Sequence, residues 1–344
     1  MGLKIGLIGC GRQAPKHVSG MRAWGDVEIM AADEEAARAR ALAAGHGVRA
    51  VCDAAAIFAD PDIAAVSICT PPASHGALVA AAIAAGKHFI CEKPLTADLA
   101  EARALEDARA RAGLVGMVGY IYRFAPAFRL GADALAGARD GAEAAALGRV
   151  TQAFFRIGGP GSHDLWQHRR GSHGGAVNEM LVHMVDLAVW YFGPMRSGRI
   201  LASRLRQPER TIRGQRVAAD AEDWIVAELV SRGGVDILVE ADLTTPTFLQ
   251  YGEVHGSNGS FMGSIQPDMT TFIHCLAPRA GFAAGRRTYD FGARNLFEAQ
   301  MGLFLDCVAG TATLDRCTLG ETLELMQALE LLAGGVAEQR GEDG

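Results

Sequence analysis

Two short stretches near the start of the sequence carry glycines and a carboxylate at a spacing that could bind a ligand. The first, Gly9-Cys10-Gly11-Arg12-Gln13-Ala14, is a G-x-G-x-x-A turn between an apolar run and a helical pattern. In such a turn the first glycine allows the bend, the second lets the backbone approach a pyrophosphate, and the small last residue lets helix and strand pack closely. The second stretch is an apolar run ending in Asp33, 19 positions after Ala14, where a carboxylate can accept hydrogen bonds from a ribose. The pattern predicts dinucleotide binding; the alternative is an ordinary glycine turn with a surface aspartate.

The residues after Asp33 bear on the choice of dinucleotide. Glu34 and Glu35 follow it directly, so a 2′-phosphate would meet three carboxylates. Repulsion between like charges at that distance favours NAD over NADP. Arg38 and Arg40 lie a turn later and could reach back to a phosphate, so NADP stays the less favoured alternative.

Polar residues also follow two further apolar runs, where open α/β sheets bind their ligands. Residues 65–69 lead into Thr70-Pro71-Pro72-Ala73-Ser74-His75, and residues 88–91 lead into Glu92-Lys93-Pro94. A lysine at such a strand end could donate a hydrogen bond to a substrate hydroxyl. The alternative is a solvated surface lysine.

A third group of polar residues lies on the helical pattern of residues 176–192. Glu179, His183 and Asp186 are spaced i, i+4 and i+7 and therefore share one face, while nearly all their neighbours are apolar. A polar stripe on such a helix lines a cavity or meets buried partners. Histidine suits general acid–base chemistry near neutral pH. The alternative is a core histidine satisfied by its neighbours.

The elements that must position these residues begin with a regular alternation. Short apolar runs of strand length lie at residues 3–8, 27–32, 65–69, 88–91 and 115–118. The helical patterns between them cover residues 13–24, 34–44, 74–85 and 99–112. Continuous apolar strands separated by helices predict a doubly wound parallel sheet covered on both faces.

Beyond residue 119 the pattern becomes mainly strand-like. A helix at 127–135, a strand at 149–157 and the helix 176–192 precede strands at 200–205, 224–230, 235–243, 250–255 and 270–274. Strands without intervening helices predict an antiparallel sheet. Two amphipathic helices follow, at residues 296–309 and 319–333. A chain of 344 residues favours about two domains, and the change of pattern divides them into 1–120 and 121–344.

These motifs resemble the Gfo/Idh/MocA (glucose-fructose oxidoreductase/inositol dehydrogenase) family over nearly the whole chain. The matching residues are Gly9 to Ala14, Asp33, Thr70-Pro71 with His75, Gly86-Lys87-His88, Glu92-Lys93-Pro94, Val118-Gly119, Arg123-Phe124 with Pro126, Gly174-Gly175-Ala176, His183 and Asp186. The resemblance implies an N-terminal Rossmann domain and a C-terminal α/β domain with a large open, mainly antiparallel sheet. It places Lys93 on the family's catalytic lysine and His183 on its general acid/base. The family usually has Asp where Glu179 stands, and the extra methylene can change whether this carboxylate orients His183 or binds substrate.

The resemblance therefore implies an NAD(P)-dependent oxidoreductase that transfers a hydride between the nicotinamide and a hydroxyl or keto carbon of a sugar, cyclic polyol or related small molecule. His183 would remove the hydroxyl proton and Lys93 would polarise the oxygen, with Glu179 as the third catalytic residue. Two alternatives stay open: a redox-neutral, glycosidase-like member with tightly bound NAD, and a non-catalytic dinucleotide-binding protein. The residues expected at the cofactor are Gly9, Gly11, Arg12, Gln13, Ala14, Asp33, Thr70, Pro71, His75, Glu92, Lys93 and Arg123. Those expected at the substrate, with loop packing as the alternative, are Tyr122, Trp166, Arg169 and His173.

Composition excludes several other classes of protein. Lys and Arg total 33 against 39 Asp and Glu, and this net charge of −6 lacks the basic footprint of a nucleic-acid binder. We expect no membrane span, because no apolar run approaches the roughly 20 residues required. We also expect no export signal, because the apolar stretch at residues 5–8 breaks at once into Gly-Cys-Gly.

The cysteine and histidine patterns predict neither disulfides nor a metal site. The seven cysteines (Cys10, Cys52, Cys69, Cys91, Cys275, Cys307 and Cys317) are odd in number and form no C-x-x-C, which favours a reducing cytoplasm. His168, His173, Glu179 and His183 could be read as metal ligands, but nothing in their spacing demands it. The expected partners are a small-molecule substrate and, by the resemblance, further copies of the chain in a homodimer or homotetramer through the C-terminal sheet.

Overall fold

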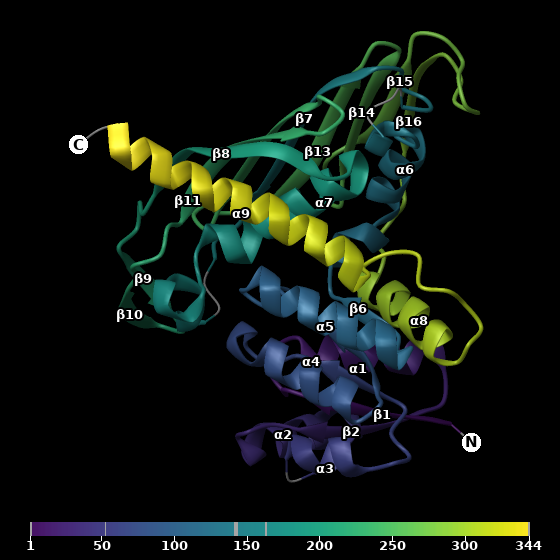
Figure 1. Cartoon of the computed structure of the whole chain (residues 1–344), viewed down its shortest axis with the longest axis vertical. Coiled ribbons are helices and arrows are strands. Elements are labelled where there is room, and N and C mark those ends of the chain that lie inside the picture. Colours follow the sequence, from purple (N-terminus) through teal and green to yellow (C-terminus); the bar gives the residue numbers. More distant parts are fainter. Residues whose placement is uncertain (1, 52, 141–143, 162–163, 343–344) are drawn as a thin grey trace. The chain divides into compact units, whose positions relative to one another are not determined.

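The computed structural model of the chain describes residues 2–51, 53–140, 144–161 and 164–342, and the side chains of its last helix as far as residue 334. Cys52, one of the seven cysteines, lies outside the described residues. The chain forms two compact units (Figure 1). The first comprises Met1–Phe124 with Asn295–Leu323, and the second comprises Ala125–Arg294 with Glu324–Gly344.

The first unit is built on a six-stranded parallel sheet with the order β3-β2-β1-β4-β5-β6 (Figure 1). Its strands are β1 (Leu3–Ile8), β2 (Val27–Ala32), β3 (Arg49–Ala50), β4 (Ala65–Ile68), β5 (His88–Cys91) and β6 (Gly116–Val118). Its helices are α1 (Ala14–Trp24), α2 (Ala36–His46), α3 (Ala54–Ala59), α4 (His75–Ala84), α5 (Leu99–Ala112) and α8 (Leu296–Val308). The strand order reverses between β1 and β4, and the carboxyl ends of strands at such a reversal are where open α/β sheets bind ligands.

This sheet confirms the predicted doubly wound parallel arrangement. Every residue of β4 is buried, as are the last four residues of β1 and of β2, because helices cover both faces. The predicted strands at 3–8, 27–32 and 88–91 match β1, β2 and β5 residue for residue. The pattern did not predict β3 and α3, since β3 has only two residues and neither is buried.

A segment distant in sequence completes the first unit. Helix α8 packs against α1 at Gly20, where a Cβ atom would lie 2.5 Å from the carbonyl oxygen of Phe297. At the end of α1, Trp24 Nε1 donates to Asp306 Oδ1 at 2.8 Å. The expected boundary near residue 120 does not anticipate this segment, because an amphipathic pattern shows that a helix covers something but not what it covers.

The second unit is built on an eight-stranded sheet with the order β16-β15-β14-β13-β7-β12-β11-β8 (Figure 1). Only β7 and β12 pair in parallel in this sheet. Its strands are β7 (Val150–Gly158), β8 (Met195–Arg204), β11 (Trp224–Ser231), β12 (Asp236–Asp242), β13 (Leu249–Gly256), β14 (Gly259–Ser264), β15 (Thr271–Cys275) and β16 (Gly285–Tyr289). The prediction of a large, mainly antiparallel C-terminal sheet is confirmed.

Shorter elements surround this sheet. A separate hairpin pairs β9 (Glu209–Ile212) with β10 (Gln215–Ala218). The helices are α6 (Pro126–Ala134), α7 (Val182–Phe192) and the part of α9 (Leu319–Glu342) from Glu324 onward. α9 extends well beyond the predicted 319–333. Within the described ranges, no helix combines the length and the apolar character that crossing a bilayer requires.

Candidate active site

The predicted G-x-G-x-x-A turn joins β1 to α1 in the first unit. Gly9 has a φ of +92° and donates its N–H to the Ala32 carbonyl oxygen at 2.9 Å. A Cβ atom there would lie 2.6 Å from the Thr70 amide nitrogen, so both the backbone and the neighbouring strand end require glycine. Ala14 is fully buried at the start of α1, as close packing of helix on strand demands.

The turn leaves room beside the backbone for a ligand. A Cβ atom placed on Gly11 would meet no described atom within 4 Å, and Arg12 is exposed. Gln13 Oε1 is buried and has no hydrogen-bond partner among the described residues. Open backbone at a helix N-terminus suits a pyrophosphate, so these residues fit a dinucleotide.

Asp33 follows β2, and the backbone holds both of its carboxylate oxygens. Oδ2 accepts from the Cys10 N–H at 2.7 Å, and Oδ1 accepts from the Glu35 N–H at 2.9 Å. Each oxygen has a second lone pair for a ribose hydroxyl. Arg38, which could have met a 2′-phosphate, forms a 2.8 Å ion pair with Glu35 on the surface. The carboxylate is therefore fixed beside the glycine turn.

His75, at the start of α4, bridges two loops. Its Nε2 lies 2.8 Å from the Thr70 carbonyl oxygen, and its Nδ1 lies 2.6 Å from the Pro94 carbonyl oxygen. The ring is buried, with 1% of its surface exposed, whereas Pro71 is exposed and Thr70 half-buried. The structure brings His75 to the predicted cofactor loops, but both ring nitrogens are already bonded to the protein.

Glu92 and Lys93, at the end of β5, have different environments. The Glu92 carboxylate is buried, and its Oε1 lies 2.8 Å from Nε2 of His17. Burial raises the pKa of Glu92, but the hydrogen bond from His17 and the charges of His17, Lys93 and His75 outweigh burial and lower it. Lys93 is half-buried and precedes the cis Lys93–Pro94 peptide bond. A partly exposed ammonium thus adjoins a buried, ionised carboxylate.

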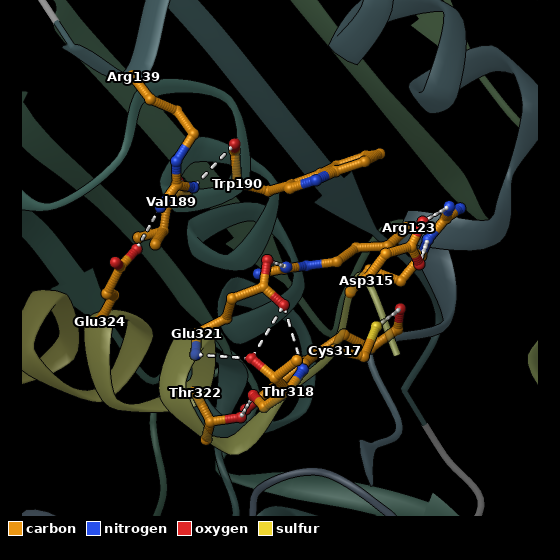
Figure 2. A network of polar contacts seen from close by, with 12 residues as sticks. Arg123, Arg139, Val189, Trp190, Asp315, Cys317, Thr318, Glu321, Thr322 and Glu324 are labelled. Atoms are coloured by element: carbon orange, nitrogen blue, oxygen red, sulfur yellow. Dashed lines mark hydrogen bonds and ion pairs between the residues drawn. The ribbon is translucent and has the colours of Figure 1, made fainter. Parts of the chain in front are cut away.

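Tyr122 and Arg123 lie in a short 3₁₀ helix, Ile121–Phe124, after β6. Burial raises the pKa of Tyr122 well above its ordinary value. Arg123 is fully buried, and its Nη1 lies 2.5 Å from Glu321 Oε1 at the start of α9, as Figure 2 shows. Glu321 also forms a reciprocal cap with Thr318. Arg123, expected at the cofactor, therefore anchors the first turn of α9.

Removing the Glu321 carboxylate is expected to destabilise the protein. Glu321→Ala removes a charge-assisted hydrogen bond from the buried guanidinium of Arg123, which costs about 1.5–3 kcal/mol of unfolding free energy. Glu324→Ala is the matched control on the same helix, because its partner Arg139 is 37% exposed and such pairs contribute about 1 kcal/mol or less. Urea unfolding followed by tryptophan fluorescence measures both variants. Equal midpoints for the two would contradict the expectation.

The helix predicted over 176–192 begins with a π-helical turn. This turn, η6 (Val177–Leu181), precedes α7, so the expected single α-helix is wrong in its first turn. Single π turns inside helices occur frequently at functional sites. Glu179 and His183 are half-buried, whereas Asp186 is buried with 1% of its surface exposed. Of the three polar residues in the predicted stripe, Glu179 and His183 are therefore more accessible than Asp186.

Residues that the sequence analysis did not single out fix the start of this helix. The Glu222 carbonyl oxygen accepts from the Ala176 N–H at 2.8 Å, and Glu222 Oε1 accepts from the Val177 N–H at 3.2 Å. A Cβ atom on Gly175 would lie 2.3 Å from Glu222 Oε1, so the glycine pair before the helix makes room for this carboxylate. Gln167 Nε2 donates to Glu179 Oε2 at 2.9 Å and holds that side chain.

The remaining predicted substrate residues lie in the loop before the helix. Trp166 is half-buried, Arg169 Nη1 lies 3.8 Å from Asp220 Oδ2, and His173 is exposed with a φ of +56°. Burial and the charge of Arg210 lower the pKa of His168 to about 4, so this ring is neutral. Across the described part of the chain, no group of three or more His, Cys, Asp or Glu side chains is arranged to hold a metal ion.

The predicted residues thus form two sets. The glycine turn, Asp33, Thr70 and Lys93 follow strand ends of the first unit, and Glu179 and His183 lie on the first turns of one helix in the second. Sequence analysis missed His17, whose only signal is its place on the buried face of α1. It also missed Gln167 and Glu222, which carry no recognisable spacing.

Comparison with known proteins places the chain in a family. A model of an oxidoreductase family with an NAD-binding Rossmann fold matches residues 3–120, and a GFO/IDH/MocA C-terminal domain model matches residues 136–262. The chain is 30% identical over 309 residues to 1,5-anhydro-D-fructose reductase of Ensifer adhaerens, covering 89% of this chain and 88% of that protein. It is 29% identical over 265 residues to inositol 2-dehydrogenase of Rhizobium meliloti strain 1021, covering 76% and 75%.

A solved structure shares the fold. Levoglucosan dehydrogenase, in complex with NADH and levoglucosan, aligns over 98% of both chains with a TM-score of 0.84 at 22% identity. The range matched by the first family model includes the glycine turn, Asp33 and the Glu92-Lys93-Pro94 turn described above. The chain belongs to the Gfo/Idh/MocA family of oxidoreductases, with an NAD-binding Rossmann fold in its N-terminal part.

Proposed function

We propose that this protein is an NAD-dependent dehydrogenase of a sugar, cyclic polyol or related small molecule, acting on one hydroxyl or keto carbon. The observation that carries the proposal is the Glu92-Lys93-Pro94 turn, where a half-buried lysine stands at a strand end between neighbours held by buried histidines. The names of the relatives support the substrate class, since they are a reductase of an anhydro sugar and a dehydrogenase of inositol.

The chain's own residues would hold NAD in the first unit. Gly9, Gly11 and the start of α1 with Arg12, Gln13 and Ala14 would receive the pyrophosphate, and Asp33 would accept hydrogen bonds from the adenosine ribose. Thr70 and Pro71 would border the cofactor, whereas His75 would act through the two loops that it joins. When bound, NAD supplies a nicotinamide ring that accepts two electrons and one hydrogen from the oxidised carbon.

The remaining residues would act on the substrate oxygen. His183 would take the hydroxyl proton in oxidation and return it in reduction, because imidazole can do both near neutral pH. The Lys93 ammonium would donate a hydrogen bond to the same oxygen and stabilise its developing negative charge. Glu179, held by Gln167, would orient His183 or bind a substrate hydroxyl. Tyr122, Trp166, Arg169 and His173 are the residues we propose for substrate contact.

Asp33→Asn is expected to reduce the preference for NAD. The substitution removes the charge that binds the ribose and repels a 2′-phosphate, and loss of one charge-assisted hydrogen bond costs about 1.5–3 kcal/mol, or roughly 10-fold or more in affinity. Fluorescence titration should show weaker NADH binding and a smaller NADH-to-NADPH ratio. Glu28→Gln is the control, because Glu28 is an exposed carboxylate of β2, the strand that leads to Asp33. Equal weakening for both dinucleotides would contradict the role of Asp33.

A substrate panel tests the proposed function directly. The purified protein is incubated with NAD or NADP and a set of sugars, anhydro sugars, inositols and sugar acids, and absorbance at 340 nm reports reduced cofactor. Turnover of at least one cyclic polyol or sugar with NAD is the expected result. Cofactor that survives gel filtration while no reduced cofactor accumulates would favour a redox-neutral reaction. NAD binding without turnover or product across the panel would favour a non-catalytic binding protein.

We further propose a cytoplasmic homodimer or homotetramer formed through the eight-stranded sheet. The strands β11 to β15 alternate buried residues with half-exposed ones, so one face of the sheet is covered within the unit. The half-exposed face is rich in large apolar residues, among them Trp224, Val226, Leu238, Leu249, Tyr251, Met262 and Phe272. Six described cysteines are free thiols, which suits a reducing compartment. Light scattering after gel filtration measures the assembly.

A further inference from the structure

A buried histidine links the helix of the glycine turn to the Glu92-Lys93-Pro94 turn. His17 lies one turn into α1 and has no exposed surface. Its Nε2 lies 2.8 Å from Glu92 Oε1, and its Nδ1 lies 2.8 Å from Ser67 Oγ. These three residues come from α1, β4 and the end of β5, so the contact joins three segments of the first unit that are distant in sequence.

The contact is an ion pair. Burial lowers the pKa of His17, but hydrogen bonds and charge interactions with Cys69 and Glu92 outweigh burial and raise it to about 10. The pKa of Glu92 is lowered. The two shifts together indicate that a protonated His17 ring faces an ionised Glu92 carboxylate. With both ring nitrogens donating, the Ser67 hydroxyl can donate in turn to Cys69 Sγ at 3.7 Å. The ring nitrogens of His17 and the hydroxyl of Ser67 thereby all have hydrogen-bond partners.

A second histidine holds the other side of Lys93. Both ring nitrogens of His75 face backbone carbonyl oxygens, those of Thr70 and Pro94, and a carbonyl oxygen can only accept. These two contacts hold the ring between the Thr70 loop and Pro94. The residue before Lys93 is therefore tied to α1, and the residue after it is tied to the Thr70 loop.

We propose that His17 and Glu92 are positioning residues that fix Lys93 for the reaction and couple its position to dinucleotide binding at the glycine turn. This inference rests on the proposed function in taking Lys93 as the catalytic lysine. The physical reason is that α1 carries both the turn that would receive the pyrophosphate and the ring that fixes Glu92. An ion pair this deeply buried permits little displacement of one end without the other, because an unpaired buried charge is costly.

The small number of lysines in the chain allows the position of Lys93 to be followed without a known substrate. The sequence contains only four lysines: Lys4, Lys16, Lys87 and Lys93. Reductive ¹³C-methylation of the full-length protein therefore gives few NMR signals, and Lys93→Arg identifies the signal of Lys93. The test variant is His17→Gln, which keeps a hydrogen-bond donor toward Glu92 but loses the charge. The control is His88→Gln. His88 is the first residue of β5, the strand that leads into Glu92, and its Nδ1 accepts a hydrogen bond from the Val115 N–H at 2.9 Å.

The expected result has three parts. His17→Gln shifts the Lys93 signal, weakens NADH binding by about 5-fold or more, and lowers kcat on a panel substrate by up to about 10²-fold. His88→Gln changes none of these. Glu92→Gln gives the same pattern, and the double variant is no worse than either single variant, because both break one pair. If His17→Gln does not fold, Glu92→Gln alone decides between the outcomes.

Two outcomes separate this inference from the proposed function. An unchanged Lys93 signal and NADH affinity in folded His17→Gln would overturn the positioning role, even if Lys93 proves essential. Full turnover by Lys93→Ala would instead overturn the catalytic assignment of the lysine, and with it the claim that its position serves the reaction. If Lys93→Ala keeps full turnover but His17→Gln still shifts the Lys93 signal, α1 is coupled to the Glu92-Lys93-Pro94 turn without a role for that coupling in the reaction. Effects of the two single variants that multiply in the double variant would also overturn the pairing.

Discussion

Replacing His183 by Asn is expected to lower kcat by about 10²–10⁴-fold on a panel substrate, the usual contribution of a positioned general base. Asparagine keeps a polar side chain of similar reach but cannot accept the hydroxyl proton. Affinity for NADH should change little, because the glycine turn and Asp33 belong to the first unit and His183 to the second. Steady-state kinetics and a fluorescence titration of NADH measure the two effects separately.

A matched variant and a rescue experiment sharpen this result. His274→Asn alters a half-buried histidine of β15 in the same unit, and its turnover should stay near that of the unaltered protein. Added imidazole should restore part of the activity of His183→Asn, because a free base can take the missing proton. Full turnover by His183→Asn, or a loss that imidazole does not relieve while NADH binding also fails, would reject the general-base role.

The strands of the first sheet could be predicted because strands buried on both faces require apolar residues, and such residues are visible in the sequence. β1, β2 and β5 are covered on both faces over most of their length, so they are mainly apolar, with polar residues such as Lys4, Glu28 and His88 near their starts. Some of the strands without this double cover were missed: β16 is exposed along nearly its whole length, and the two strands of the β9–β10 hairpin contain one arginine each. Pairing through backbone hydrogen bonds leaves no such trace in side-chain type.

The site shows a different limit of sequence reasoning. Residue type and position at a strand end correctly indicate where Gly9, Asp33 and Glu92 lie, since parallel strands end at one edge of their sheet. The sequence does not show which partner a side chain takes across the fold. Arg123 pairs with Glu321, far along the chain, and His17 pairs with Glu92 from another crossover. Long-range pairs of this kind depend on packing that only the folded chain defines.

The second unit makes the same point about helices. A period of 3.6 residues predicted one helix over 176–192, and apolar periodicity alone does not distinguish its first, π-helical turn from an α-helical one. The cause lies outside the helix, where Glu222 accepts from the Ala176 and Val177 N–H groups and Gln167 holds Glu179. The accessible pair Glu179 and His183 is thus shaped by residues from two other segments.

Lys93→Ala is the second substitution expected to have a large effect. Removing one preorganised donor to a developing oxyanion typically costs about 10²–10³-fold in kcat. The loss should appear mainly in kcat, because Lys93 would strengthen its bond to the oxygen as negative charge develops there. Lys93→Arg should retain part of the activity, since it keeps the charge, although the planar guanidinium cannot reproduce the geometry of the ammonium.

The four lysines of the chain supply the control. Lys4→Ala removes an ammonium that pairs with Asp60 at 2.7 Å and should leave turnover unchanged. Burial lowers the pKa of Lys87, whose Nζ donates to two backbone carbonyl oxygens, so this residue is a structural one. If Lys93→Ala lost activity only through weaker NADH binding, with kcat intact at saturating cofactor, Lys93 would be a cofactor residue. A fall in kcat at saturating NAD, absent in Lys4→Ala, is the result that identifies it as the donor to the substrate oxygen.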